Sequence, residues 1–360
     1  MISEAALGFL TELLATPGPS GFEAAPARRW RKEAESFAAQ VRSDVSGNSY
    51  ATLTGDAAPG VAPLMLAGHI DEIGLMVVHI DDQGFLWFDP IGGWDPQVFV
   101  GQRVILLGKD GPVTGVIGRI AIHLLEKEAR EKVIRPQDLW IDIGASSRED
   151  AAGRVRVGDP GVLAAPVERF PNGRLVSRSL DNRIGAFVVL EALRRLQNDR
   201  LAVPVTAVAT SHEEICYASG GGARTSAAGL EPVAAIAVDV THATDTPGVE
   251  KKRHGQVTLG GGPVLTRGAV LNPRLFELLV ETAESEGIPY IVKGVARDTG
   301  TDADNIVGAL RGVATALVSV PLRYMHSPNE LVDLEDLDRT AALLAAFARR
   351  LPPAPDLVSR

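Results

Sequence analysis

The chain has 360 residues, 45% of them hydrophobic and 22% charged, and its 36 Lys and Arg against 45 Asp and Glu give a net charge of −9. This length favours two domains over one core. The acidic balance, with no basic cluster, argues against nucleic acid or an anionic membrane as a partner. A single cysteine, Cys216, excludes an internal disulfide framework and fits a reducing compartment.

The N-terminal segment carries Glu4 and Glu12 and no early Lys or Arg. We therefore expect no signal peptide. No uncharged apolar stretch reaches the length of a membrane span, so we expect a cytoplasmic protein.

The first part of the chain combines predicted helices with short strands. Apolar residues at helical spacing predict a helix over residues 2–15. Ser20 and Glu23 resemble a capping box that opens a second helix, reaching about residue 39. Strands are predicted at residues 41–45 and 50–53, and the apolar run at residues 61–66 predicts a buried strand that His69 follows.

From residue 75 to about residue 164 the pattern changes to alternation with a period of two, interrupted by Asp-Gly-type turns. This pattern predicts a β-rich insertion at residues 75–164, with one short helix near residues 124–132. The insertion splits an α/β domain formed by residues 1–74 and 165–360.

Strands and helices alternate again after the insertion. This alternation predicts an α/β fold with a mainly parallel mixed sheet, covered by helices on both faces. The predicted strands are residues 203–210, 233–240, 290–295 and 314–320, and the predicted helices are residues 184–196, 272–286, 304–311 and 334–351.

Side chains of the types that bind metals collect where apolar strands end. The carboxyl ends of parallel strands form the ligand crevice of such a sheet. Histidines together with carboxylates suit zinc or cobalt, whereas calcium takes oxygen ligands only. A carboxylate shared between two ions about 3.5 Å apart would make a co-catalytic pair. The candidates are His69, Glu213, Glu214, Asp239 and His326 at strand ends, and Asp181 before a helix.

Asp71 lies two residues after His69, a spacing that suits a carboxylate holding the second N–H of a ligand imidazole. Taken singly, each candidate also has an ordinary structural interpretation. Asp239 could cap a strand, and adjacent glutamates are usually solvated. Asp181 could stabilise a helix dipole. The joint pattern, with ligand-type residues at the same end of several strands, favours a metal site.

Five segments occur in an order that resembles the tetrahedral (TET) aminopeptidases, the family of glutamyl and deblocking aminopeptidases within the di-zinc exopeptidases. The resemblance covers nearly the whole chain, including the β-rich insertion. The segments are AGHIDEIG at residues 67–74, SRSLDNRIG at 177–185, HEEI at 212–215, DVTHATDTPG at 239–248 and PLRYMHSPNE at 321–330.

The resemblance implies an aminopeptidase that removes N-terminal residues from peptides with two divalent ions, zinc foremost and cobalt or manganese as alternatives. It implies that Glu213 is the general base for a water activated by both ions, and that Asp71 orients His69. The implied ligands are His69 and Asp239 for one ion, Glu214 and His326 for the other, and Asp181 bridging them.

The resemblance also implies an assembly. The insertion would be a barrel-like dimerisation module, and dimers could build a twelve-subunit tetrahedral shell that admits only small or unfolded peptides. A dimer alone remains an alternative.

Two stretches depart from the family pattern. Residues 216–222 replace a Gly-Leu-Arg-Gly-like segment, which leaves the pocket wall open, and Cys216 itself is expected to be a small buried hydrophobe. Asp304 stands where a small residue is usual. It is either a helix N-cap or a carboxylate near the cleft that favours basic groups. The predicted site excludes the other histidines, namely His79, His123, His212, His242 and His254.

Three other functions fit parts of the pattern. A deacylase or carboxypeptidase-type amidohydrolase would use the same metal set with different groups for the substrate ends. A metal-bound scaffold without activity would have no need of Glu213. We reject a glycosidase, since its carboxyls flank the sugar about 5–9 Å apart and adjacent glutamates fit that geometry poorly.

Overall fold

The strand that ends at His69 lies inside an eight-stranded mixed sheet in the computed structural model, which describes residues 1–215 and 220–358. Strands β12, β3, β13 and β16 are parallel neighbours. Strand β2 runs antiparallel to β1 and β12, and β14 runs antiparallel to β16 but parallel to β15. The predicted mainly parallel sheet is therefore confirmed. From edge to edge the strands are β1 (Gln40–Ser43), β2 (Ser49–Leu53), β12 (Val205–Thr210), β3 (Leu64–His69), β13 (Ala234–His242), β16 (Thr315–Leu322), β14 (Val264–Gly268) and β15 (Ile291–Val295).

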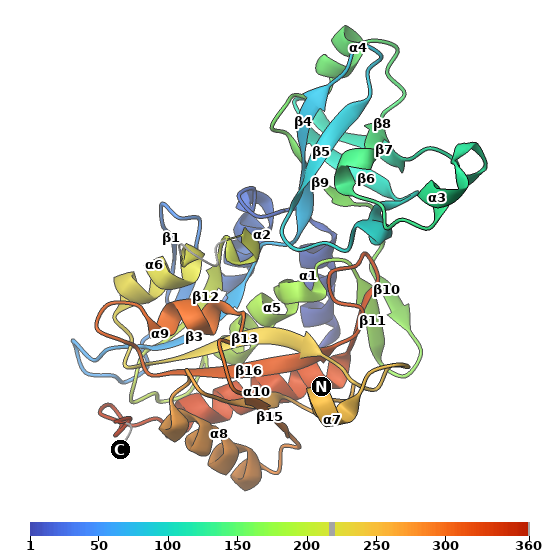
Figure 1. Ribbon diagram of the computed structural model, residues 1–360. Helices are drawn as coiled ribbons and strands as arrows, with labels where there is room; N and C mark the ends of the chain where they lie inside the picture. The colour runs from blue at the N-terminus through green and yellow to red at the C-terminus, as the bar shows by residue number, and fades with distance from the viewer. Residues whose placement is uncertain (216–219, 359–360) are drawn as a thin grey trace.

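Helices cover both faces of this sheet (Figure 1). Side chains alternate across a strand, so Leu64 and Leu66 of β3 enter one core while Met65 and Ala67 enter the other. The larger core is closed by α1 (Glu4–Ala15), α2 (Ala24–Ala34), α5 (Leu180–Arg195), α8 (Pro273–Glu286) and α10 (Leu334–Arg350). The smaller core is closed by α6 (Gly221–Leu230) and α9 (Asp302–Val307).

A closed barrel stands away from the α/β body (Figure 1). Side chains alternate along its strands, so that residues such as Leu75, Val77, Val104 and Leu106 point inward and form a separate hydrophobic core. Going around the barrel, the strands are β4 (Gly74–Ile80), β5 (Leu86–Ile91), β8 (Trp140–Asp142), β7 (Gly111–Gly118), β6 (Arg103–Gly108) and β9 (Pro160–Leu163). Short helices join them: η1 (Pro96–Phe99), η2 (Ile122–Leu124), α3 (Lys127–Arg130), η3 (Pro136–Asp138) and α4 (Arg148–Ala152).

A small antiparallel sheet lies beside the main body. It consists of β10 (Glu168–Phe170), β11 (Arg174–Ser177) and β17 (Glu330–Asp333). Strand β17 pairs with β11 so that Glu330 lies opposite Ser177. This pairing brings the end of the PLRYMHSPNE segment next to the start of SRSLDNRIG.

The predicted capping box before α2 is wrong. Glu23 is the N-cap residue of α2 but makes no capping hydrogen bond, and its carboxylate accepts the Gly21 and His212 N–H groups. The hydroxyl of Ser20 instead donates to Asp71. The long-range partner therefore outcompetes the local cap.

The helices within residues 1–215 and 220–358 include none with both the length and the apolar character needed to cross a membrane.

Candidate metal centre

The candidate site lies at the carboxyl ends of the parallel strands. His69 is the last residue of β3 and pairs in register with Thr210, the last residue of β12. Asp239 lies within β13, opposite Ser319 of β16. Strand β13 extends two residues beyond the predicted end at residue 240, because it continues to His242 alongside β16.

Asp181 reaches the site through close packing of α5 against β3. A Cβ atom on Gly68 would lie 2.5 Å from the carbonyl carbon of Gly185, so β3 needs glycine at this position. Asp181 and Asn182 have non-helical dihedral angles at the start of α5. The Asn182 side chain donates to the carbonyl oxygen of Val238 at 2.7 Å, which ties this turn to the strand that carries Asp239.

Asp181 contacts both histidines of the site. Its Oδ1 lies 3.3 Å from Nε2 of His69, and its Oδ2 lies 3.3 Å from Nε2 of His326. Asp239 Oδ1 lies 3.9 Å from the same His69 nitrogen, and Glu214 Oε2 lies 3.5 Å from Nε2 of His326. The site thus has two halves that share one carboxylate.

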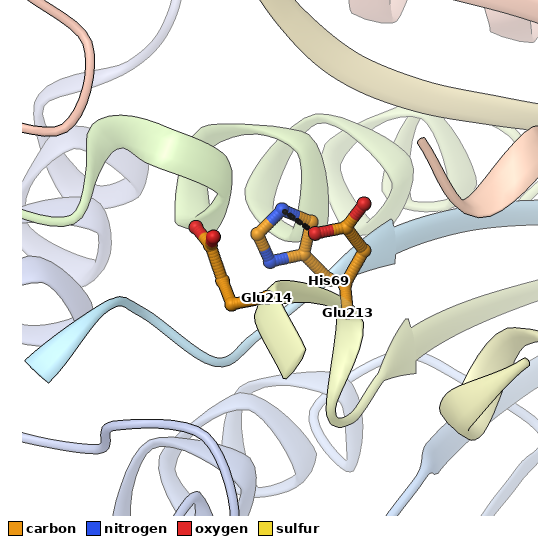
Figure 2. Close-up of side chains that lie close together, drawn as sticks. All are labelled: His69, Glu213 and Glu214. Atoms are coloured by element: carbon orange, nitrogen blue, oxygen red, sulfur yellow. Dashed lines mark ion pairs between the residues drawn. The ribbon is translucent and has the colours of Figure 1, made fainter. Parts of the chain in front are cut away.

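The Glu pair follows β12 in a short 3-10 turn, η4 (Glu213–Ile215). Asp71 holds this turn, since its Oδ1 accepts the Glu213 N–H at 3.2 Å and its Oδ2 accepts the Glu214 N–H at 3.1 Å. Figure 2 shows the imidazole of His69 between the two carboxylates, with Glu213 Oε2 3.7 Å from Nε2.

Asp71 also faces the other ring nitrogen of His69. Nδ1 lies 3.2 Å from the Asp71 backbone oxygen and 3.4 Å from its carboxylate Oδ1. The carboxylate is therefore near enough to orient the ring, and the backbone oxygen is the nearer of the two acceptors. Asp71 links His69 to the Glu pair, a connection that its spacing in the sequence does not reveal.

Burial sets the electrostatics of the site. It raises the pKa of Glu213, Glu214 and Asp239 well above the ordinary carboxyl range, and Asp181 adds to the rise at Glu214. The pKa of Asp181 is lowered, because hydrogen bonds from His326 and His69 outweigh its burial. The pKa of His69 is well raised, since Glu213 and the neighbouring aspartates outweigh its own burial.

The arrangement suits cations. Ligand atoms lie within 4.8 Å of one another in three groups, two of which share Asp181: His69 with Asp181 and Asp239, and Asp181 with Glu214 and His326. The third group is His69 with Glu213 and Glu214. Glu214 Oε1 is buried without a hydrogen-bond partner. A buried carboxylate oxygen of this kind is costly unless a proton or a cation meets it.

The cluster opens into a cavity of about 210 Å³. Its walls include residues that the predicted site left out: Thr241, His242, Lys293, Thr299, Gly300, Thr301 and Met325. His242 lies in the segment at residues 239–248, but nothing in the sequence around this single histidine indicated that it lines the cavity. Lys293 comes from β15, at the edge of the sheet, where spacing gives no hint of a cleft.

Asp304 neither caps α9 nor lines this cavity. Thr301 is the N-cap residue, and its hydroxyl accepts the Ala303 N–H. The Asp304 carboxylate accepts the N–H groups of Thr299 and Gly300, and so shapes the turn that forms the cavity wall. The expected burial of Cys216 falls outside the residues that the structure describes.

Several known proteins that this chain resembles are aminopeptidases or peptidases. The model of the M42 glutamyl aminopeptidase family matches residues 47–343. The lysyl aminopeptidase of Pyrococcus furiosus is 36% identical over 350 residues, covering 96% of this chain and 97% of the relative. The structure of a TET aminopeptidase from a marine sediment Thaumarchaeota archaeon has a TM-score of 0.90 at 32% identity, covering 97% of each chain. The TET1 peptidase of Pyrococcus horikoshii, which can assemble into a tetrahedron or a large octahedral shell, has a TM-score of 0.85 at 30% identity, covering 96% of this chain and 100% of that one.

The chain belongs to the M42 glutamyl aminopeptidase family. The resemblance to TET aminopeptidases inferred from five segments is confirmed, and so is the predicted fold class. The aminopeptidase class is confirmed at the level of the family.

Proposed function

We propose that this protein is a metal-dependent aminopeptidase that hydrolyses N-terminal residues from peptides, with two divalent ions and Glu213 as general base. The observation that carries the proposal is the position of Asp181, whose two carboxylate oxygens each lie 3.3 Å from the Nε2 atom of a different histidine. A carboxylate in this position suits a bridge between two ions.

The donor set fits two ions of the zinc type. His69 and Asp239 would hold one ion, Glu214 and His326 the other, and Asp181 both. Imidazole and carboxylate suit zinc, and also cobalt or manganese. When bound, the ions would polarise the scissile carbonyl and lower the pKa of the attacking water.

Glu213 is placed to move the proton. Its Oε2 faces the cluster, 3.7 Å from Nε2 of His69, while Glu214 points to the other half of the site. Its pKa is well raised, by burial first, so the carboxyl can both accept a proton and release it. In our proposal Glu213 takes a proton from the attacking water and passes it to the leaving amine.

Hydrolysis assays on metal-stripped protein test this function. Free-amine aminoacyl amides and their N-acetylated versions would be offered after reloading with zinc, cobalt or manganese, while elemental analysis counts the bound ions. Metal-dependent cleavage of the free-amine set alone is the expected result. Cleavage of the acylated set alone would reassign the protein as a deacylase. No hydrolysis of either set with both ions bound would favour an inactive scaffold.

We further propose that the two parts of the chain have different roles. Residues 1–74 and 165–360 form the catalytic domain, and the barrel at residues 75–164 mediates assembly. The family relative that forms a tetrahedron supports a homo-oligomer. The barrel itself supports it too, because Ile120, Ile122, Leu124 and Val133 are each more than half exposed. Clustered exposed apolar side chains of this kind mark contact surfaces.

Light scattering on the purified protein tests the assembly. We expect a dimer or a dodecamer that Leu124→Glu weakens, because a charge would be buried at the contact. Val157→Glu is the matched control, since Val157 is an exposed apolar residue of the same insertion outside that cluster. A monomeric wild-type protein would overturn this part of the proposal.

A further inference from the structure

We propose that the barrel holds one half of the metal centre in place, because the backbone of Gly93 positions the imidazole of His326. The inference rests on the proposed metal-dependent function and goes beyond it, since it gives the barrel a role at the active site in addition to assembly. The segment that carries this role is residues 92–95, which joins β5 to η1.

The ring of His326 needs support from outside its own loop. His69 ends a central strand, and the Asp71 carboxylate lies 3.4 Å from its Nδ1 atom. His326 instead lies in the connection between β16 and β17, where Glu330 accepts its backbone N–H. The Nε2 atom of His326 faces Asp181, so Nδ1 is the ring nitrogen left for a supporting hydrogen bond.

The backbone of Gly93 provides this support. A side chain on Gly93 would begin 3.5 Å from both Nδ1 and Cε1 of His326, so the barrel backbone lies against the ring. Burial lowers the pKa of His326, but the hydrogen bond and charge of Asp181 and a hydrogen bond to the Gly93 backbone raise it overall. A bond that favours the protonated ring has the ring N–H as its donor, so the carbonyl oxygen of Gly93 is the acceptor. A backbone carbonyl in this position fixes the tautomer and the angle of a metal-binding imidazole.

Gly92 brings the same segment close to the other ligand of this half. Its φ is +80°, and a Cβ atom on it would lie 2.5 Å from Cγ2 of Ile73 and 3.5 Å from Cβ of Glu214. Only a residue without a side chain lets the backbone approach this closely in that conformation. The barrel therefore lies against the half of the centre that Glu214 and His326 form.

Trp94 fixes the segment to the rest of the barrel. Its indole N–H lies 2.9 Å from the carbonyl oxygen of Gly74 and 3.2 Å from that of Ile91, and it can donate to both. The centre of its ring lies 4.8 Å from that of Phe99, a residue of the barrel core. The place of the Gly93 carbonyl is therefore set by the barrel strands.

Two glycine variants test the positioning role. Gly92 and Gly101 both lie in the barrel with similar positive φ values, +80° and +77°. A Cβ atom on Gly92 would clash with Ile73, whereas one on Gly101 meets nothing within 4 Å. Both alanine variants are strained, but only Gly92→Ala pushes the segment away from the body. We expect Gly92→Ala to lower the affinity for one of two zinc ions by about 10- to 100-fold, and Gly101→Ala to keep both affinities. Zinc titration of the metal-stripped protein against a competing chelator measures them.

A pair of tryptophan variants gives a second test, which holds if Gly92→Ala does not fold. Trp94→Phe keeps an aromatic ring in the barrel core but loses the N–H that faces Gly74 and Ile91. Trp87→Phe is the matched control, because its indole N–H bonds to Asp81 at 3.4 Å elsewhere in the barrel. Trp94→Phe should weaken the same ion as Gly92→Ala does, and Trp87→Phe should weaken neither.

Two further readouts separate positioning from a general loss of stability. The visible absorption of the cobalt-loaded protein depends on ligand geometry, and it should change in Gly92→Ala and Trp94→Phe but not in the two controls. In a His326→Ala background the ring is absent, so adding Gly92→Ala should leave the affinity for the remaining ion unchanged.

The outcomes distinguish this inference from the proposed function. Unchanged affinities in Gly92→Ala and Trp94→Phe would overturn the positioning role, and so would an equal loss of both ions. Metal-dependent hydrolysis by the wild-type protein would still support the peptidase function in either case. Selective weakening of one ion in a protein that hydrolyses no peptide would keep the positioning role and overturn the peptidase function.

Discussion

The Glu330 carboxylate accepts the backbone N–H of Asp181 at 3.0 Å, and its other oxygen accepts the backbone N–H of His326 at 2.9 Å. One buried side chain therefore positions the shared carboxylate and one histidine of the candidate metal centre. Such supporting hydrogen bonds fix the orientation of metal ligands.

Glu330→Gln should weaken the centre without unfolding the protein. The amide has one oxygen, so its NH₂ group must face one of the two N–H donors and leave it unpaired. We expect metal affinity and kcat/KM to fall by about 10- to 100-fold, as for other residues that support metal ligands. Titration with a metal chelator and steady-state kinetics provide the measurements. Glu335→Gln, which removes only an exposed pair with Arg339, is the control, and equal behaviour of the two variants would contradict the positioning role.

Glu213→Gln should separate chemistry from metal binding. The amide cannot accept the proton, so we expect kcat to fall by at least about 100-fold while both ions remain bound. Steady-state hydrolysis assays measure kcat, and elemental analysis of the same sample counts the bound ions. Undiminished turnover would remove Glu213 from the base role.

The shared position of Asp181 predicts different metal contents for different variants. His326→Ala removes a ligand from one half of the site, so we expect the other half to keep its ion. Asp181→Ala removes a ligand from both halves and should lower the occupancy of each. Elemental analysis after dialysis against equal metal concentrations distinguishes them, and identical contents would argue against a bridging carboxylate.

Metal removal should make the stability of the protein sensitive to pH. Because burial raises the pKa values of Glu213, Glu214 and Asp239, the metal-free folded chain holds more protons above about pH 5 than the unfolded chain does. The raised pKa of His69 acts with the same sign. The free energy of unfolding of the metal-free protein should therefore fall as the pH rises from about 5 to 8.

Denaturant unfolding with and without added zinc checks this pH dependence. Zinc should offset the loss, since the ion binds the deprotonated ligands and stabilises the folded state. Proton release on zinc binding, measured by calorimetry in two buffers, should accompany it. A metal-free stability that rises with pH would show that the buried carboxyls are already ionised.

Much of the architecture could be predicted from local patterns. Apolar runs and their spacing identified the central parallel strands and the helices on their faces, and period-two alternation marked the stretch that forms the barrel. Other elements escaped prediction because tertiary packing forms them. Helix α6 contains four residues that disfavour helix on their own, Gly221, Gly222, Thr225 and Gly229, yet Ala223 and Ala227 pack into the core beside α9. Strand β14 is short and pairs with β16 at only two positions.

The sequence by itself determined which residues could meet at one edge of the sheet, because the carboxyl ends of parallel strands must lie together. His69, Glu213, Glu214, Asp239 and His326 follow from that rule, and the distances among them depend on the fold. Only the tertiary structure decided which groups support them. Ser20 with Asp71, Glu330 with Asp181, and Lys293 with Thr241 are pairs 51, 149 and 52 residues apart. Hydrogen bonds between such distant residues depend on packing, and no periodicity in the chain encodes them.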